Sequence, residues 1–291
     1  MNVIELNKIA KQMAGEGKGI LAADESMNTV GKRFAAINLE NTEDNRRAFR
    51  HMLLTAPGEN KYISGVILFD ETIRQNDLNG KSFVSVLQGE GILPGIKVDQ
   101  GLTPMAEGSV EQLTKGLDTL AERLKEYVAM GAKFCKWRSV VTIGEGIPTD
   151  ANIAQNAKDL AQYALICQEA GLVPMVEPEV LLEGSHTIEE AGAASEKILT
   201  VLFEELEKAG VILEGVILKT SMVLPGKDSG QKATPEQVGE ATLRVFKKAL
   251  PDRKIVEIDC SLLIEEGGGL HCMSKQEPGG LVYPSFGSFN K

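Results

Sequence analysis

The chain has 291 residues, a formal net charge of −10, 43% hydrophobic residues and 25% charged residues. This composition is ordinary for a globular protein, and the length allows one large α/β domain or two small ones. The negative charge disfavours nonspecific binding to nucleic acid or to an anionic membrane surface. An anionic substrate would therefore need a local basic pocket within this negative overall field.

Cysteine usage and hydropathy indicate the compartment. The four cysteines, Cys135, Cys167, Cys260 and Cys272, are far apart and form no CxxC motif, so we expect free thiols in a reducing environment. The first residues lack the hydrophobic region of a signal peptide, and no apolar run reaches membrane-spanning length. We expect a cytoplasmic protein with no membrane partner.

Helical and strand-like patterns alternate along the chain. Apolar residues at helical spacing, together with capping residues, predict helices over residues 3–13, 41–55, 82–88, 109–130, 150–170, 187–209 and 234–250. Short apolar runs predict strands over residues 19–23, 63–69, 93–99, 133–138, 172–176, 213–219, 254–258 and 281–283.

This alternation predicts βαβ units and a parallel sheet. Two architectures compete, an open doubly wound sheet and a closed (β/α)8 TIM barrel. No GxGxxG motif follows the first strand, and the chain contains no GxxxxGK[ST] motif, which weighs against a nucleotide-binding sheet. Eight predicted strands favour the barrel. No linker-like segment divides the chain, so we expect a single barrel domain over residues 1–291.

The most informative strand is predicted over residues 213–219, where an apolar run ends in Lys219 and is followed by Pro225-Gly226. A lysine in this position lies where the core meets a cleft, and poor hydration there favours a neutral amine. Such an amine attacks carbonyl groups and forms a Schiff base. The competing interpretation is a lysine that simply extends into solvent from a strand end.

Charged residues lie at or just after the carboxyl ends of several predicted strands. They are Asp24, Lys97, Asp99, Lys136, Arg138, Glu177, Glu179 and Lys219. If strand ends were charged only because they are hydrated, charges would occur at both ends, but the preceding ends carry mostly glycine, leucine or isoleucine. In a barrel the following ends ring one mouth, where barrel enzymes hold their active sites. The mixture of lysines and carboxylates suits proton transfer.

Six ordered motifs resemble those of class I fructose-1,6-bisphosphate aldolases. They are Gly19-Ile20-Leu21-Ala22-Ala23-Asp24-Glu25-Ser26, Gly65-Val66-Ile67-Leu68-Phe69, Gly95-Ile96-Lys97-Val98-Asp99, Lys136-Trp137-Arg138, Val176-Glu177-Pro178-Glu179, and Leu218-Lys219 with Met222-Val223. The resemblance covers residues 4–250. It implies a TIM barrel and a lyase that cleaves fructose 1,6-bisphosphate reversibly into dihydroxyacetone phosphate and glyceraldehyde 3-phosphate in glycolysis and gluconeogenesis.

The resemblance also implies roles for individual residues. Lys219 matches the Schiff-base lysine, Glu177 the general acid/base beside it, Glu179 an electrostatic neighbour, Lys136 the second cation, and Asp24 the group that handles the proton during carbon–carbon cleavage. Substrate-binding roles are implied for Arg138, Lys97, Ser26, Thr29, Arg33, Ser285 and Gly287. Family members are typically cytoplasmic tetramers that need no metal or other cofactor.

The histidines agree with a mechanism that does not use a metal. A metal-dependent aldolase needs histidine ligands. Of the three histidines, His51 lies on a charged predicted helix, His186 in a polar loop and His271 beside Cys272 in a glycine-rich region. None lies at a predicted strand mouth near a second histidine. A protonated imine supplies the electron sink for cleavage without a metal.

Beyond residue 250 the sequence departs from the family pattern. Glu265 and Glu266 stand where the family has a serine-glycine loop, and Ser288 stands at the position of a phosphate-binding arginine. Arginine offers phosphate a bidentate fork that serine lacks, so we expect weaker phosphate binding. The sequence also has no counterpart of the last outer barrel helix. Two alternatives to the aldolase stay open: a catalytically impaired aldolase-like scaffold or binding protein, and a Schiff-base lyase for another sugar phosphate.

Overall fold

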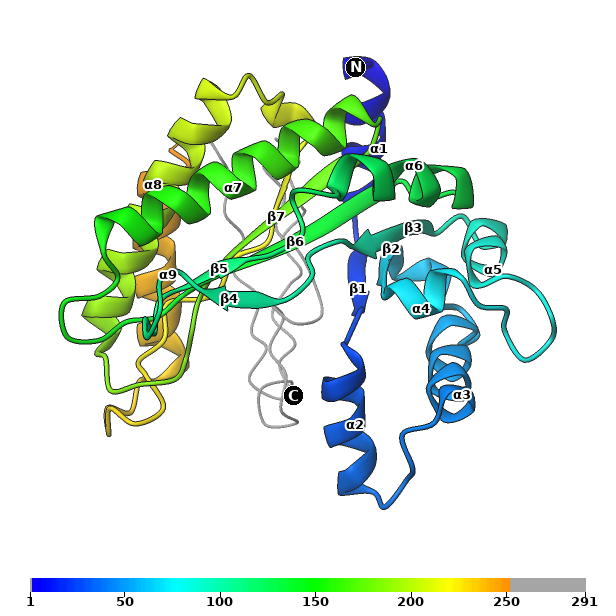
Figure 1. The fold of residues 1–291 in the computed structure, drawn as a ribbon, viewed down its shortest axis with the longest axis horizontal. Coiled ribbons are helices and arrows are strands. Elements are labelled where there is room, and N and C mark those ends of the chain that lie inside the picture. The colour runs from blue at the N-terminus through cyan, green and yellow to red at the C-terminus, as the bar shows by residue number, and fades with distance from the viewer. Residues whose placement is uncertain (1, 252–291) are drawn as a thin grey trace, which may run out of the picture.

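The computed structural model describes residues 2–251. Six parallel strands form one sheet in which neighbours in the chain are neighbours in space, in the order β1-β2-β3-β6-β7-β8 (Figure 1). Their bounds are β1 (Gly19–Ala23), β2 (Ile63–Leu68), β3 (Leu93–Lys97), β6 (Phe134–Val141), β7 (Val173–Val180) and β8 (Ile217–Leu218). A separate antiparallel pair consists of β4 (Leu102–Pro104) and β5 (Gln112–Thr114).

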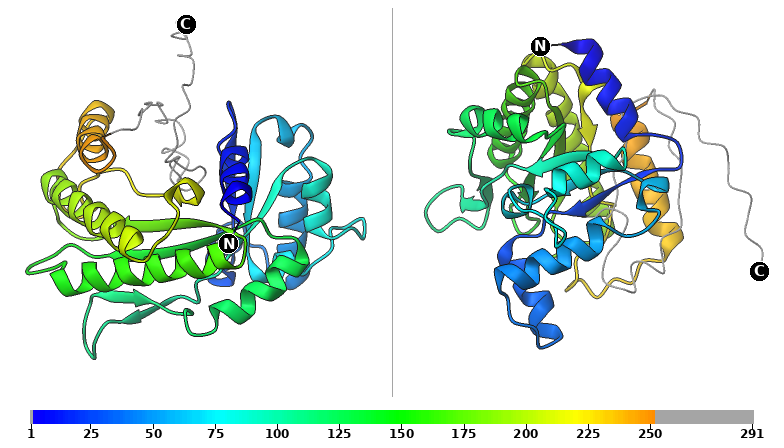
Figure 2. Two further views of the ribbon diagram at one scale, coloured as in Figure 1. Left: turned by 90° about the horizontal axis from the view of Figure 1, so that it is seen from above. Right: turned by 90° about the vertical axis from the view of Figure 1, so that its right-hand side faces the viewer.

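The long helices α7 (Asp150–Glu169) and α8 (Ile188–Lys208) lie on the outside of the curved sheet (Figures 1 and 2). The other helices of the described residues are α1 (Val3–Met13), α2 (Met27–Ala36), α3 (Glu43–Leu54), η1 (Glu59–Lys61), α4 (Asp70–Ile73), α5 (Phe83–Gly89), α6 (Leu120–Met130), η2 (Leu213–Gly215) and α9 (Pro235–Ala249). Threonines cap the long outer helices. Thr149 is the N-cap of α7, and Thr187 and Thr234 are the N-caps of α8 and α9, where each forms a reciprocal capping box.

The sheet has two buried faces because side chains alternate along each strand. On β6, Cys135 and Trp137 join the large core beneath the helices, whereas Phe134 belongs to the smaller core on the inner face. A sheet buried on both faces and curled inward with helices outside is the arrangement of a (β/α)8 barrel. The predicted fold class is therefore confirmed over the six parallel strands of this sheet.

Helix α1 covers the amino-terminal end of the inner face. Its buried side chains Leu6, Ile9 and Met13 form one cluster with inward-facing residues that include Ile20 and Phe134. The same face is apolar at this end and becomes charged toward the carboxyl ends of the strands. The inner face therefore has one sealed end and one polar end.

Several sequence-based boundaries were wrong. The helix predicted over residues 109–130 begins only at Leu120, and residues 112–114 form β5 instead. Gly116 has φ of 112°, a conformation that ends a right-handed helix. The hydroxyl of Thr114 donates to the carbonyl of Arg138 at 2.8 Å, which attaches this segment to β6. The helix α2 and the pair β4-β5 were not predicted.

The strand predicted over residues 213–219 is mostly not a strand. Residues 213–215 form η2, and β8 contains only Ile217 and Leu218. The side chain of Gln168 explains this, because its amide binds the carbonyls of Ile212 and Gly215 and its oxygen accepts from the Ile212 N–H. These backbone groups are satisfied by a side chain and not by a neighbouring strand.

Two other strands are longer than predicted. The strands predicted over 133–138 and 172–176 continue to Val141 and Val180, so Glu177 and Glu179 lie within a strand and not after it. The strands predicted over 254–258 and 281–283, and the expectation that the last outer helix is lacking, concern residues outside the described part. Between residues 2 and 251, no helix is long and apolar enough to span a membrane.

Glu59 gives this fold a testable pH dependence. Burial, and then repulsion from Glu90, raises the pKa of Glu59 from 4.5 to about 7. Because the folded state binds this proton more tightly than the unfolded state, stability is fully present below about pH 4.5 and declines as the pH rises to about 7. We expect Glu59→Gln to raise the free energy of unfolding at pH 8 by about 1 kcal/mol, a value discounted for partial exposure.

The measurement is urea unfolding at pH 5 and pH 8 for the wild type, Glu59→Gln and the exposed control Glu16→Gln. Measured against the wild type at the same pH, only Glu59→Gln should be more stabilised at pH 8 than at pH 5. Equal pH dependence in all three proteins would exclude Glu59 as the source.

Candidate active site

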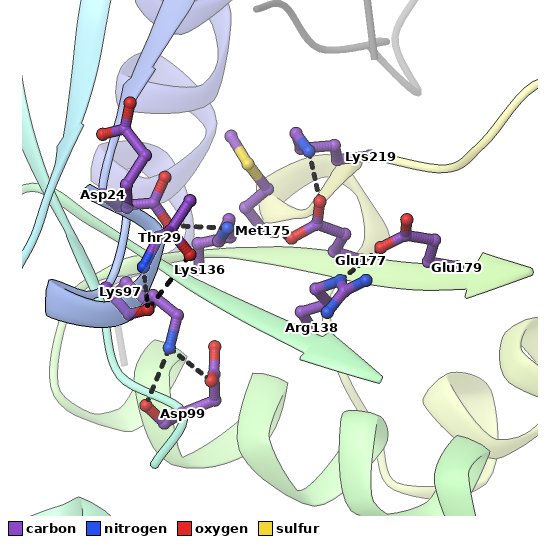
Figure 3. A network of polar contacts seen from close by, with 12 residues as sticks. Asp24, Thr29, Lys97, Asp99, Lys136, Arg138, Met175, Glu177, Glu179 and Lys219 are labelled. Atoms are coloured by element: carbon purple, nitrogen blue, oxygen red, sulfur yellow. Dashed lines mark hydrogen bonds and ion pairs between the residues drawn. The ribbon is translucent and has the colours of Figure 1, made fainter. Parts of the chain in front are cut away.

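Strand alternation brings the predicted charged residues to one region of the inner face. On β6, Lys136 and Arg138 follow Phe134 at two-residue intervals, and on β7 Glu177 and Glu179 follow Met175 in the same way. The apolar member of each series packs in the inner core. The charged members occupy the same face nearer the carboxyl ends, where barrel enzymes hold their sites (Figure 3).

Four of these residues form a continuous chain of alternating charge. The Lys219 ammonium contacts Oε1 of Glu177, whose Oε2 lies 3.0 Å from Nζ of Lys136. Nζ of Lys136 lies 2.6 Å from Oδ2 of Asp24 (Figure 3). The exposed fractions are 5% for Lys219, 2% for Glu177, 6% for Lys136 and 7% for Asp24. In such a buried setting, charge pairs are weakly screened and proton transfers between neighbours are favoured by proximity.

Strand register and sheet curvature both contribute to this chain. Val176 pairs with Leu218, and the Lys219 N–H donates to the Val176 carbonyl at 2.9 Å, so Lys219 is adjacent to Glu177. Asp24 follows β1, however, and β2 and β3 separate β1 from β6. Three interstrand steps in a flat sheet would span roughly 14 Å. The contact between Asp24 and Lys136 therefore requires the curled sheet.

Lys136 is held as a cation. Burial alone lowers the pKa of Lys136, but the charges of Asp24 and Glu177 outweigh it and raise that pKa well above the usual range. The sequence predicted a second cation beside Lys219, and the structure places Lys136 on the same carboxylate that Lys219 contacts.

Two further ion pairs lie beside this chain. Arg138 contacts Glu179, and Nζ of Lys97 contacts the carboxylate of Asp99 and donates to its carbonyl at 3.1 Å. Burial lowers the pKa of Arg138, but the hydrogen bond that Arg138 donates to Glu179, together with the charges of Glu179, Glu177 and Asp99, outweighs burial and raises that pKa. Asp99 was noted as a charge after a strand but was not assigned to the site. Its partnership with Lys97 is visible only in the structure.

The three predicted phosphate contacts lie at and after the start of α2. Ser26 is the N-cap of α2 and its Oγ lies 3.1 Å from Oγ1 of Thr29. Arg33, one turn further on, forms an ion pair with Glu25. No role was predicted for Glu25 from the sequence. Together these residues form a polar helix start directly after Asp24.

Some predicted site residues cannot be placed. Ser285 and Gly287, as well as the departing residues Glu265, Glu266 and Ser288, lie outside the described residues. Within the described part, no group of three histidine, cysteine or acidic side chains is arranged to hold a metal ion.

The two described histidines lie away from the chain of alternating charge. His51 on α3 faces Asp77, with Nδ1 3.7 Å from Oδ2. His186 was expected in a polar loop but is buried, because the residues around Gly226 pack closely over it. Cys135 and Cys167 are buried free thiols.

A curled parallel sheet that carries two buried lysines and two buried carboxylates on its inner face, toward the carboxyl ends of its strands, belongs to the class of barrel proteins. Comparison with known proteins specifies the family. A model of the class-I fructose-bisphosphate aldolases matches residues 5–256. The chain belongs to this family.

Individual relatives agree with this assignment. The chain is 50% identical over 247 residues to cytosolic fructose-bisphosphate aldolase 4 of Arabidopsis thaliana, covering 85% of this chain and 63% of that protein. It is 50% identical over 251 residues to a probable class 1 aldolase of Xanthomonas campestris, covering 86% and 75%. The match to the first relative thus spans less than two thirds of its length.

A solved structure shows the same fold. The fructose-bisphosphate aldolase of Plasmodium falciparum, in complex with TRAP and a small-molecule inhibitor, matches with a TM-score of 0.83 and 46% identity. The match covers 86% of this chain and 72% of that one. The residues 2–251 therefore carry the architecture of the family.

Proposed function

We propose that this protein is a Schiff-base aldolase that cleaves fructose 1,6-bisphosphate reversibly into dihydroxyacetone phosphate and glyceraldehyde 3-phosphate. The observation that supports this most directly is the buried chain Lys219–Glu177–Lys136–Asp24. It provides a lysine, a carboxylate in contact with it, a second fixed cation and a second carboxylate. A covalent aldol mechanism needs these four groups.

The two buried lysines have different roles in this proposal. Lys136 lies between two carboxylates, which raise its pKa and keep it charged, so it is unsuited to attack a carbonyl. Lys219 contacts one carboxylate, Glu177, and shares it with Lys136. Glu177 contacts the Lys219 ammonium and is placed to accept a proton from it. Lys219 is therefore the nucleophile.

The reaction then proceeds through a protonated imine. The amine of Lys219 adds to the C2 ketone, and Glu177 donates a proton so that the C2 oxygen leaves as water. Asp24 removes the proton of the C4 hydroxyl, the C3–C4 bond breaks, and its electron pair moves into the iminium to give an enamine. The aldehyde leaves, C3 takes a proton, and hydrolysis of the iminium releases the ketone phosphate and the free lysine.

The remaining site residues bind substrate in this proposal. Arg138 and Lys97 contact hydroxyl or phosphate oxygens after exchanging their carboxylate partners Glu179 and Asp99. Ser26, Thr29 and Arg33 at the start of α2 hold a phosphate. We further propose a cytoplasmic homotetramer acting in glycolysis and gluconeogenesis, supported by family membership and by a relative named cytosolic.

Trapping the imine with borohydride tests the proposal. The full chain is incubated with dihydroxyacetone phosphate, reduced, digested and mapped by mass spectrometry. Label is expected on the peptide that contains Lys219. Label only elsewhere would contradict the assignment, and a folded protein without label would favour the impaired scaffold. Label with other ketose phosphates but not with dihydroxyacetone phosphate would favour a lyase for another substrate.

Metal removal provides a second prediction. Because the electron sink is the protonated imine, we expect EDTA to leave cleavage of fructose 1,6-bisphosphate unchanged. The measurement compares initial rates before and after chelation, with zinc added back. An activity lost on chelation and restored by zinc would require a different mechanism.

A further inference from the structure

A buried arginine outside the site binds Glu25, which lies between Asp24 and the start of α2. Arg50, on α3, is only 3% exposed. Its Nη1 lies 2.6 Å from Oε2 of Glu25, and its Nη2 donates to the main-chain carbonyl of the same residue at 3.2 Å. One guanidinium thus fixes both the side chain and the backbone of Glu25. A planar fork with several donors can do this, whereas a lysine ammonium cannot match the geometry.

Glu25 stands between two groups of the site. The preceding residue, Asp24, contacts Lys136 at 2.6 Å, and the following residue, Ser26, is the N-cap of α2. Asp24 reaches into the barrel mouth while Glu25 contacts Arg50 on α3, as expected where successive side chains of an extended segment point to opposite sides. A shift of the Glu25 backbone would therefore move the Asp24 carboxylate and the start of α2 together.

Helix α2 has few other attachments. It buries two side chains, Val30 and Phe34, and Phe34 packs edge-on against Phe49 of α3 at a centroid distance of 5.8 Å. The other oxygen of Glu25 binds Arg33 of α2. The carboxylate of Glu25 therefore links α3, through Arg50, to the helix that carries the proposed phosphate contacts.

We propose that Arg50 is a positioning residue for the aldol reaction. Acting through Glu25, it sets the distance between the Asp24 carboxylate and the substrate and holds the polar start of α2 in place. This inference depends on the proposed function, because it concerns the same site. Arg50 itself touches no reacting atom.

The test uses the full chain with Arg50→Met and Arg50→Lys, and Arg46→Met as the matched control. Arg46 lies one turn earlier on α3 and forms a partly buried bidentate pair with Glu71, which is outside the site. Rates are divided by the number of imine sites that borohydride traps, so that a loss of folded protein does not count as a loss of kcat.

We expect Arg50→Met to lower kcat for fructose 1,6-bisphosphate by roughly 10- to 100-fold, the scale of an ångström-sized misplacement. Arg50→Lys should recover part of this loss, and Arg46→Met should keep kcat within about twofold of the wild type. In an Asp24→Asn background the Arg50 substitution should reduce kcat much less, because its target is already removed. Hydrogen exchange over residues 24–34 should accelerate in Arg50→Met and not in Arg46→Met.

The outcomes are distinguishable. A wild-type chain that neither traps an imine nor cleaves the substrate would overturn the proposed function, and hydrogen exchange would then still decide whether Arg50 holds residues 24–34. An active wild type together with Arg50→Met that keeps normal kcat or normal exchange would overturn the positioning role. If Arg50→Met does not fold, Arg50→Lys and Glu25→Gln decide in the same way.

Discussion

Replacing Lys219 with alanine is expected to reduce cleavage of fructose 1,6-bisphosphate by at least roughly 10⁴-fold, equivalent to about 5.5 kcal/mol of transition-state stabilisation. The alanine has no amine to form the imine, and Lys136 cannot replace it because its carboxylate partners raise its pKa and keep it charged. Borohydride trapping should be lost together with turnover. The measurement combines initial rates with peptide mapping after reduction.

The fold should survive this substitution. Glu177 keeps its contact with Lys136 at 3.0 Å, so its charge remains compensated after Lys219 is removed. The matched control is Lys227→Ala, which removes an exposed lysine paired with Glu183 at 3.1 Å and should leave rates unchanged. Residual trapping in Lys219→Ala at wild-type level would show that another lysine forms the imine.

Replacing Gly95 with alanine is expected to lower the stability of the folded protein more than any other single substitution proposed for this chain. Gly95 lies in β3 between Ile67 and Phe134, and a methyl group there would lie 2.2 to 2.5 Å from ring carbons of Phe134. Phe134 is fully buried in the inner core and has little room to move. We expect the free energy of unfolding to fall by about 2 to 3 kcal/mol and the Tm by roughly 5 to 10 °C.

The control is Gly89→Ala at the end of α5, where an added methyl group meets nothing within 4 Å and should be neutral or mildly stabilising. Thermal unfolding by circular dichroism measures both variants. The double variant Gly95→Ala with Phe134→Leu should recover part of the loss if the clash with the ring is the cause. Equal unfolding temperatures for Gly95→Ala and the wild type would contradict this account of the inner core.

Local patterns in the sequence were sufficient to predict the barrel and most of its outer helices. Alternating apolar runs and helical segments predicted a parallel sheet. Parallel strands need a crossover, and a helix after each strand returns the chain to the end of the sheet where the next strand begins. Two-residue spacing also predicted that Lys136 and Arg138, like Glu177 and Glu179, share a face. These features depend on near neighbours in the chain, so the sequence by itself determined them.

Boundaries were less predictable where distant groups satisfy the backbone. The side chain of Gln168 holds residues 212–215 out of the sheet, and Thr114 attaches β5 to the carbonyl of Arg138. Neither partner is close in sequence to the segment it controls. Apolar periodicity contains no information about such contacts.

Only the tertiary structure decided which charged side chains contact one another. Asp24 and Lys136 are 112 positions apart in the sequence. Asp24 follows β1 and Lys136 lies in β6, and β2 and β3 separate these two strands, yet the charged atoms lie 2.6 Å apart. The curvature of the sheet creates this contact, because a flat sheet would leave roughly 14 Å between the two strands. The hydrogen bonds that Arg50 donates to Glu25 also depend on the tertiary structure, since α3 packs beside the end of β1. Residue types and spacing determine which groups are available for chemistry, and the curvature of the sheet determines which of them interact.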